Sequence, residues 1–108
     1  MENCTPEISF RFKNLNKLQA FTLEREVQGS TYVMACNKEC YVGSVPLNDL
    51  SIQEINDFYV RQMVHISDCD IFVSVVSENN SNIVDIPSVL NRMLKYIDCN
   101  LTYSFAVK

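Results

Sequence analysis

The sequence predicts an α+β domain in which helices pack on a mixed β-sheet. Three observations lead to this prediction: strand-like segments fill the N-terminal half, two later segments have helical periodicity, and a short apolar run separates them. The 108 residues are close to the commonest domain size, and only 2 Gly and 3 Pro leave little room for linkers. We therefore expect residues 1–108 to form a single globular domain with the order ββββ-α-β-α-β, an N-terminal antiparallel β-meander followed by two helix crossovers.

The first two predicted strands cover residues 7–13 and 21–27, because apolar residues alternate there with polar ones. In the first strand, Ile8, Phe10 and Phe12 would point to the core while the residues between them face solvent. Such alternation is typical of a strand in a sheet with one buried face.

The segments around the second strand are interpreted from residue type. Residues 14–20 are expected to form a loop or one helical turn, with Leu15 and Leu18 pointing inward. Residues 28–30, Gln-Gly-Ser, interrupt the pattern. The run 31–36 is apolar or small on both faces, which is typical of a central strand.

The sequence CNKEC at 36–40 places two cysteines around a charged, turn-prone tripeptide. We interpret it as a tight turn that leads into a fourth strand at 41–45. In this turn Cys36 and Cys40 would be cross-strand neighbours, and Gly43 is expected to mark a β-bulge in the strand that follows.

A helix is predicted over residues 52–66. Ser51 and Glu54 have the spacing of a capping box, and Leu50 and Ile55 have that of a hydrophobic staple. Helical spacing also relates a set of apolar and aromatic residues that would form the buried stripe of this helix. These residues are Ile52, Ile55, Phe58, Tyr59, Met63 and Ile66.

The C-terminal part predicts a strand, a helix and a strand. The apolar run 71–76 is typical of a strand that is covered on both faces. Asp85 is expected to open a second helix with Pro87 in its first turn, and 101–107 alternate as a last strand. The buried stripe of the second helix is predicted to contain Leu90, Met93, Leu94 and Ile97.

Charge and composition narrow the classes of partner. The formal net charge is −4, and residues 48–108 carry the whole excess, with eight acids against four bases. This balance argues against nucleic-acid binding and suits a basic protein partner. The first twenty residues lack the apolar run of a secretory signal, and no apolar stretch is long enough to span a bilayer. We therefore expect a cytoplasmic protein with no membrane contact and with reduced cysteines.

Two alternatives compete with the turn at 36–40. Cys36 and Cys40 have the spacing of half a zinc site, which His65 and Cys69 would complete, or of a strained redox pair. Structural zinc needs four ligands, and the sequence has no second closely spaced cysteine pair. We favour the turn and expect neither a metal nor a cofactor.

Motifs for catalysis are absent from the sequence, which has no nucleophile elbow, P-loop or dinucleotide fingerprint. His65 is the only histidine, and we expect it in the last turn of the first helix, where a cation is favourable. Asp68 and Asp70 are close enough in sequence for acid–base chemistry, but at a strand entry they are expected to be solvated turn residues. We predict that the protein is not an enzyme and has no catalytic residue.

The predicted binding site lies at the carboxyl ends of the strands. If the crossovers join parallel strands, the start of the first predicted helix and the loop after strand 71–76 lie at this same end of the sheet, where such sheets bind their partners. Its side chains are acceptors for Lys and Arg. The predicted partner-binding residues are Asp49, Glu54, Asp57, Glu78, Asn79, Asn80, Asn82 and Asp85. Asp68, Asp70 and Asp98 are expected at the opposite end of the strands.

These features together favour a protein that binds another protein. In size, acidity and lack of catalytic residues the chain is similar in type to bacterial immunity proteins that neutralise nuclease toxins, although no motif carries this similarity. The predicted function is therefore a cytoplasmic inhibitor that covers the active site of one basic toxin or effector with an acidic surface. The alternative is a small-ligand-binding or regulatory domain that acts as a homodimer through an exposed strand edge.

Overall fold

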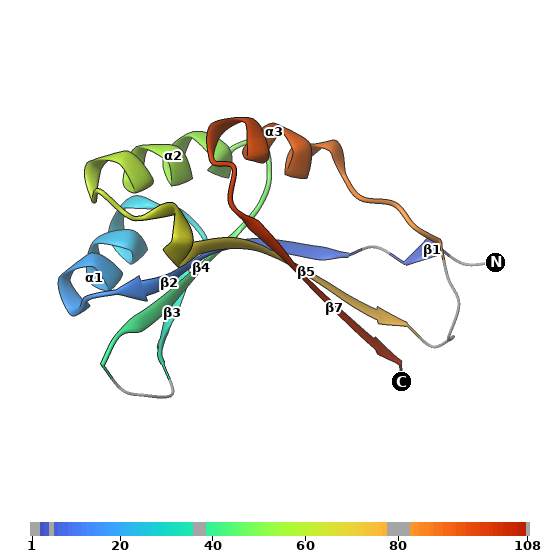
Figure 1. Ribbon diagram of the computed structural model, residues 1–108, viewed down its shortest axis with the longest axis horizontal. Coiled ribbons are helices and arrows are strands. Elements are labelled where there is room, and N and C mark those ends of the chain that lie inside the picture. Colours follow the sequence, from blue (N-terminus) through green and yellow to red (C-terminus); the bar gives the residue numbers. More distant parts are fainter. Residues whose placement is uncertain (1–2, 5, 36–38, 78–82, 108) are drawn as a thin grey trace.

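The computed structural model describes residues 3–4, 6–35, 39–77 and 83–107. The strands are β1 (Asn3–Cys4), β2 (Glu7–Leu15), β3 (Thr31–Met34), β4 (Tyr41–Pro46), β5 (Cys69–Ser77), β6 (Ile83–Val84) and β7 (Asn100–Val107). The helices are α1 (Lys17–Glu26), α2 (Ser51–Arg61) and α3 (Ser88–Tyr96), with one 3-10 turn at Ile66–Asp68. In the part of the chain that is described, the three helices cover one face of the main sheet (Figure 1). The protein is thus an α+β domain, as predicted.

The main sheet has five strands in the order β3-β4-β2-β5-β7. Each strand from β3 to β5 in this order pairs antiparallel with the next, whereas β7 lies parallel to β5, so the sheet is mixed. The β2-α1-β3-β4-α2-β5 part follows the split β-α-β, ferredoxin-like order, and α3 with β7 extends it by one crossover. A second, two-stranded sheet pairs β1 with β6.

The core lies between the helices and the inward face of the sheet. Alternate residues of β2 are buried there, as the alternation of Ile8, Phe10 and Phe12 predicted. Phe12 packs edge-on between Phe10 and Phe58 of α2, with ring centroids 5.0 Å apart in both pairs. These aromatic contacts hold α2 against β2, which is the middle strand of the sheet.

The prediction of a strand at 21–27 is wrong, because these residues belong to α1 and its C-cap. Asn16 caps the helix: its side chain accepts from the Gln19 backbone N–H at 2.8 Å, and the Gln19 side chain accepts from the Asn16 N–H at 3.0 Å. This capping box outweighs a short apparent alternation. The N-terminal half is therefore β-α-β-β rather than a meander. Leu15 points inward as expected, but Leu18 is exposed.

Two further strand predictions need correction. The run 31–36 is not a central strand, since β3 is an edge of the sheet whose residues are mostly exposed. The prediction that the apolar run of β5 is covered on both faces holds for one face: its core-facing residues are buried, whereas on the helix-free face Phe72 is half-buried and Val76 is exposed. The CNKEC turn cannot be compared with the structure, because Cys36 lies outside the described residues.

The helix predicted at 52–66 corresponds to α2, but its predicted N-terminal cap was wrong. The capping side chain is Asn48, whose Oδ1 accepts from the N–H groups of Leu50 and Ser51, both at 2.9 Å. Ser51 instead accepts from the Asn48 N–H at 3.0 Å, and Glu54 accepts weakly, at 3.4 Å, from the Gln28 N–H. Leu50 is exposed, so no hydrophobic staple forms.

The same helix is shorter than predicted. It ends at Arg61, and Met63 then adopts a left-handed φ of 53° that turns the chain away. Met63 and Ile66 are consequently exposed rather than part of the buried stripe, whereas Tyr59 packs against the core as expected. His65 is exposed beyond the helix end and precedes the 3-10 turn, so its predicted place in the last helical turn was wrong.

The second predicted helix forms, but it starts later than expected. α3 begins at Ser88 with Pro87 as its N-cap, so the prediction that Asp85 opens the helix with Pro87 in its first turn was wrong. The helix buries Leu90, Met93 and the following Ile97, with Leu94 partly buried. The final strand forms as predicted. Gly43 does not itself bulge; the irregularity lies opposite, between Phe12 and Leu15 of β2.

Candidate functional site

The acidic residues predicted around α2 are already engaged with neighbouring side chains or backbone. Asp49 forms an ion pair with Arg92 of α3. Asp57 is exposed and accepts a hydrogen bond from Gln53 at 2.9 Å. Glu54 is half-buried beside the backbone of Gln28. The positive charge of Arg92 offsets that of Asp49, so the start of α2 presents less negative charge than the sequence suggested.

The remaining predicted site residues lie in or beside the segment that follows β5. Glu78, Asn79, Asn80 and Asn82 lie outside the described residues. Asp85 is exposed and precedes α3. The predicted placement of Asp68, Asp70 and Asp98 at the amino ends of the last strands agrees with the structure. β5 and β7 are parallel and begin side by side, with Asp70 opposite Asn100.

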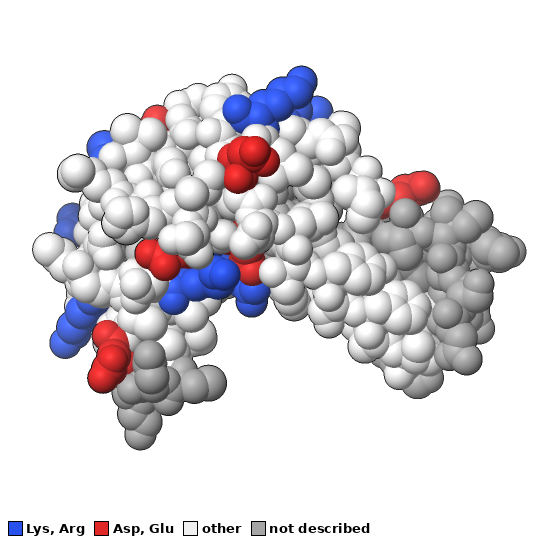
Figure 2. Space-filling model, in the orientation of Figure 1, with Lys and Arg blue, Asp and Glu red and all other residues white. Residues whose placement is uncertain are grey.

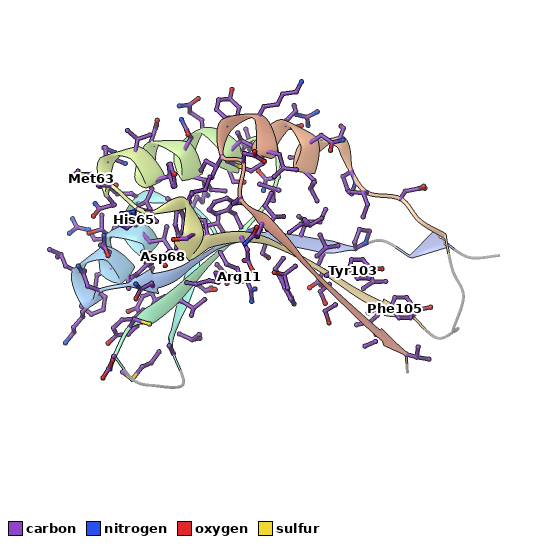
Figure 3. The ribbon with its side chains drawn as sticks, viewed as in Figure 1. Arg11, Met63, His65, Asp68, Tyr103 and Phe105 are labelled. Carbon is purple, nitrogen blue, oxygen red and sulfur yellow. The ribbon has the colours of Figure 1, made fainter. Side chains whose placement is uncertain are left out.

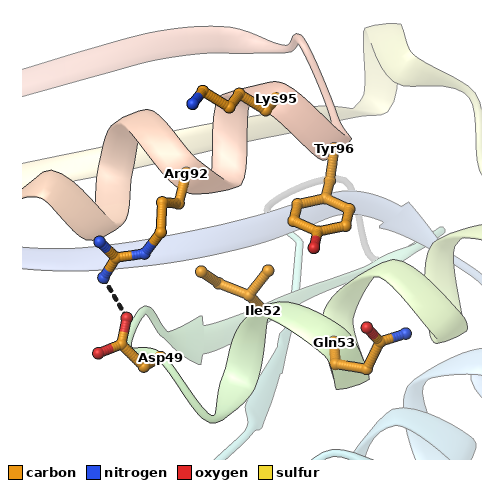
Figure 4. A pocket seen from close by; sticks show the side chains of 6 residues that line it. All are labelled: Asp49, Ile52, Gln53, Arg92, Lys95 and Tyr96. Carbon is orange, nitrogen blue, oxygen red and sulfur yellow. Dashed lines mark hydrogen bonds and ion pairs between the residues drawn. The ribbon is translucent and has the colours of Figure 1, made fainter.

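A shallow groove of about 380 Å³ runs between α2 and α3. Its lining residues are Asp49, Ile52, Gln53, Arg92, Lys95 and Tyr96. Figure 4 shows Arg92 reaching from α3 toward Asp49 at one end, with Tyr96 and Gln53 toward the other. With two bases and one paired acid, the groove does not provide the acidic surface that a basic partner would need.

A buried charged network, which the sequence did not reveal, joins three strands on the helix-free face of the sheet. Asp70 of β5 is 1% exposed and receives a bidentate pair of hydrogen bonds from Arg11 of β2, one of them at 2.7 Å. Thr102 of β7 donates its hydroxyl to the same carboxylate at 2.7 Å. The Arg11 guanidinium also lies 4.4 Å from the ring centre of Phe72.

The network keeps Asp70 ionised despite its burial. Desolvation by burial acts to raise the pKa of Asp70, but the hydrogen bonds from Arg11 and Thr102 and the nearby positive charges outweigh it, so the pKa lies below its usual range. Asp70 was expected to be a solvated turn residue, and this was wrong. Since these hydrogen bonds come from the strands on both sides of β5, the role of Asp70 is to hold β2, β5 and β7 together.

The thiols near this network are not poised for reaction. Burial raises the pKa of Cys69 to about 12 and that of Cys99 to about 11. Both thiols are therefore protonated at neutral pH, when only the thiolate is a good nucleophile. Among the described residues, no three His, Cys, Asp or Glu side chains gather closely enough to hold a metal ion. The zinc alternative includes Cys36, outside these residues, and stays untested.

The most distinctive surface of the described residues is a row of apolar side chains on β7. Leu101 pairs with Ile71 of β5 and Tyr103 pairs with Val73, so these side chains belong to the core face of the sheet. Ile71 and Val73 are buried, but the β7 side chains are not. The exposed fractions are 53% for Leu101, 52% for Tyr103, 39% for Phe105 and 49% for Val107. We call these four residues the β7 row.

The β7 row is uncovered because the helix layer is too small to reach it. α3 has nine residues, roughly 13 Å of helix. β7 has eight residues and spans roughly 26 Å. The buried side of α3 is already occupied by the core. Figure 3 shows Tyr103 and Phe105 on the same side of β7, at the end of the molecule away from His65 and Met63.

β7 also lacks the features that protect edge strands from pairing. Natural edge strands are protected by charges, Pro, bulges or short length. Residues 100–107 contain no charged residue and no Pro, and they pair with β5 without a register shift. In the face seen in Figure 2, the described surface along this strand is uncharged, while the basic and acidic side chains lie elsewhere. Within the described residues, β7 has a paired strand on one side alone.

The sequence contained a signal for this strand but not for its exposure. The alternation in 101–107 is the same as that of a half-buried strand, and it was interpreted as a last strand without any statement about its cover. Whether the apolar half is covered depends on where α3 lies. The homodimer alternative did include an exposed strand edge, without assigning it to β7.

Comparisons with known proteins do not assign the chain to a class: no family model, curated protein or solved structure matches it. Within the described residues, no helix has both the length and the apolar character needed to cross a bilayer.

Proposed function

We propose that this protein is a binding protein without catalytic activity, and that it associates with another protein chain through the β7 row. The observation that carries this proposal is four consecutive inward-facing positions of one edge strand that are apolar and 39–53% exposed. Large apolar patches on soluble domains generally mark sites of interaction. An uncharged edge strand adds a row of backbone donors and acceptors to the same site.

The expected mode of binding is strand addition. A strand from the partner would pair with the outer edge of β7, and its alternate side chains would pack on the β7 row. Backbone hydrogen bonds would then supply affinity and the two aromatic side chains would supply specificity. Tyr103 and Phe105 are the expected main contributors, because aromatic residues dominate the energetics of most interfaces.

A pull-down with a matched pair of variants tests this proposal. Tyr103→Lys places a charge in the middle of the β7 row, whereas Tyr96→Lys makes the same change at a tyrosine of similar exposure on α3. We expect the wild type and Tyr96→Lys to retain the same defined partner from the native cell, and Tyr103→Lys to lose it. Equal retention by both variants would rule out the β7 row as the binding surface.

The inhibitor of a basic toxin or effector is a narrower proposal within this class. It is supported by the acid excess of residues 48–108 and by the exposed carboxylates Asp57 and Asp85. Such binding would weaken steeply with salt, because exposed charges are screened. The charge reversals Asp57→Lys and Asp85→Lys should then weaken binding of a basic partner at low salt. Unchanged affinity in the double variant would eliminate the acidic-surface mechanism while leaving binding through β7 in place.

A further inference from the structure

We propose that the occupant of the β7 row is a second copy of this chain, so that two β7 strands pair antiparallel and join two five-stranded sheets into one. This inference rests on the proposed function and names its partner. The pairing is isologous: each copy uses the same residues, related by a two-fold axis perpendicular to the sheet. The helices of both copies then lie on the same side of the joined sheet.

The pattern of the β7 row makes it complementary to itself. Read from Leu101 to Val107, it is aliphatic, aromatic, aromatic, aliphatic, and it has the same pattern in reverse. When antiparallel strands pair, residues directly opposite one another project to the same face. Two copies of the β7 row would therefore meet on the core face, aromatic against aromatic and aliphatic against aliphatic. A heterologous partner would have no reason to require such symmetry.

This symmetry selects one register, with Ser104 of each copy opposite Ser104 of the other. Tyr103 then faces Phe105 of the second copy, and Leu101 faces Val107. A shift by two residues would place either Leu101 or Val107 opposite a position outside β7. A shift by one residue would bring the β7 row opposite side chains of the helix-free face. The register centred on Ser104 is thus the one that pairs all four residues of the β7 row.

The absence of charge on β7 makes this contact compatible with the net negative charge of both copies. Two copies that each carry −4 repel one another at a distance. The eight residues of β7 carry no charge, so in this register no like charges are brought face to face. On the helix-free face, the opposing side chains would be Thr102 with Ala106 and Ser104 with itself, all small and uncharged.

The available area predicts a reversible dimer of moderate affinity. With roughly 150–250 Å² for each aromatic side chain, a half-exposed row of four side chains leaves on the order of 300–400 Å² of apolar surface per copy. A standard interface buries about 800 Å² per partner, so the paired backbone edges and the helix-free face must supply the rest. We therefore expect a dissociation constant in the micromolar range rather than a permanent dimer.

Sedimentation velocity over a concentration series, from micromolar to hundreds of micromolar, tests the proposal on the full chain. We expect a monomer–dimer equilibrium that salt does not weaken, because no ion pair is at the contact and salt screens the repulsion between the two negatively charged copies. Tyr103→Lys should raise the dissociation constant about a hundredfold or more, since it buries an unpaired charge against an aromatic ring. Tyr96→Lys, the control on α3, should leave it unchanged.

A second variant tests the register. Adding Phe105→Glu to Tyr103→Lys places the introduced carboxylate of each copy opposite the introduced ammonium of the other, twice per dimer. In the register centred on Ser104, this double variant should recover at least about tenfold of the lost affinity through the new ion pairs. In a register that opposes position 103 to itself, the double variant would stay monomeric, which would overturn the pairing proposed here.

The outcomes separate this inference from the proposed function. A chain that is monomeric at every concentration overturns the homodimer, while loss of a different partner by Tyr103→Lys in the pull-down would still support binding through β7. A dimer that Tyr103→Lys does not weaken uses another surface, which overturns the homodimer through β7. A dimer that the single change breaks and the double change restores supports both proposals. Circular dichroism and urea unfolding of each variant show that it folds.

Discussion

The two edges of the main sheet differ in one respect that matters for binding. At the β3 edge, Tyr32 faces the helix layer and is covered: its ring centre lies 5.8 Å from that of Phe21 in α1 and 5.7 Å from that of Tyr41. At the β7 edge, Tyr103 also faces the helix layer, but half of it is exposed. The β3 edge has four residues, whereas the β7 edge has eight.

This comparison shows that the exposure of an edge depends on the helix layer rather than on the strand. Both edges contain a tyrosine on the side of the helix layer, and neither contains a charge within the strand. α1 lies against β3 and β4, where Gly43 allows the close approach of Leu23. The short α3 leaves β7 without equivalent cover. The helix layer therefore covers the tyrosine at one edge and leaves the whole β7 row uncovered at the other.

The largest effect should come from breaking the network that anchors β7 and β2 to β5. Arg11→Leu would leave the Asp70 carboxylate buried without its cation and should cost about 3–5 kcal/mol in the free energy of unfolding. The double change Arg11→Met with Asp70→Leu should recover most of this loss, because a buried ion pair can be replaced by packed apolar side chains. Urea unfolding measures both. Equal losses in the single and double variants would contradict an ionic role.

A smaller effect should follow from adding a side chain at Gly43, where Leu23 of α1 packs closely against β4. A Cβ at position 43 would lie 2.3 Å from Leu23 Cδ2 and 3.1 Å from Leu15 Cδ1. Gly43→Ala should therefore destabilise the domain by about 1–3 kcal/mol through overpacking. Ser44→Ala, on the other face of β4, is the matched control and should be nearly neutral. A stable Gly43→Ala variant would mean that α1 can move away without loss.

The comparison is sharpest for the two edge tyrosines. Tyr32→Ala removes two ring contacts and should cost about 2 kcal/mol in monomer stability. Tyr103→Ala removes a half-exposed ring and should cost roughly 0.5 kcal/mol when measured in dilute monomer. In binding, the order should reverse, with Tyr103→Ala the more damaging change. Equal costs in unfolding would show that β7 is as well covered as β3.

The smallest effect is the dependence of the free energy of unfolding on acid pH, which comes from the Asp70 carboxylate that anchors β7. The pKa of Asp70 in the folded protein lies below the ordinary value of 3.8, so the carboxylate contributes stability above that value. This contribution should be lost as the pH falls below 3.8 through the folded pKa. Urea unfolding along an acid pH series should show a shallower loss for Asp70→Asn than for the wild type. Parallel curves would contradict the assignment.

Much of the fold could be predicted where a pattern repeated over a whole element. The alternation of β2 and the helical spacing of α2 and α3 each extended over several turns or residue pairs, and these elements formed as predicted. The prediction failed at α1, because alternation over four positions looked like a strand while the capping pair Asn16 and Gln19 went unnoticed. It failed again at the end of α2, where a left-handed residue stops the helix.

The candidate site was predicted less well, because it depends on distances between elements. The acidic residues Asp49, Glu54 and Asp57 do lie around α2, but Asp49 meets Arg92 from α3, which is 43 positions later in the chain. Asp70 was assigned to solvent although Arg11 is 59 positions away in sequence and directly opposite in the sheet. Such partners are not visible in a local pattern.

By itself the sequence determined the class of the fold, the alternation of strand residues and the uncharged character of β7, because these depend on residues close along the chain. Only the tertiary structure decided that Asp70 is buried against Arg11, that α1 packs on Tyr32 at the β3 edge, and that the β7 row stays exposed. Those outcomes depend on helix length, strand order and the close approach of distant segments. Burial is a property of the packed layers, and no single strand can specify it.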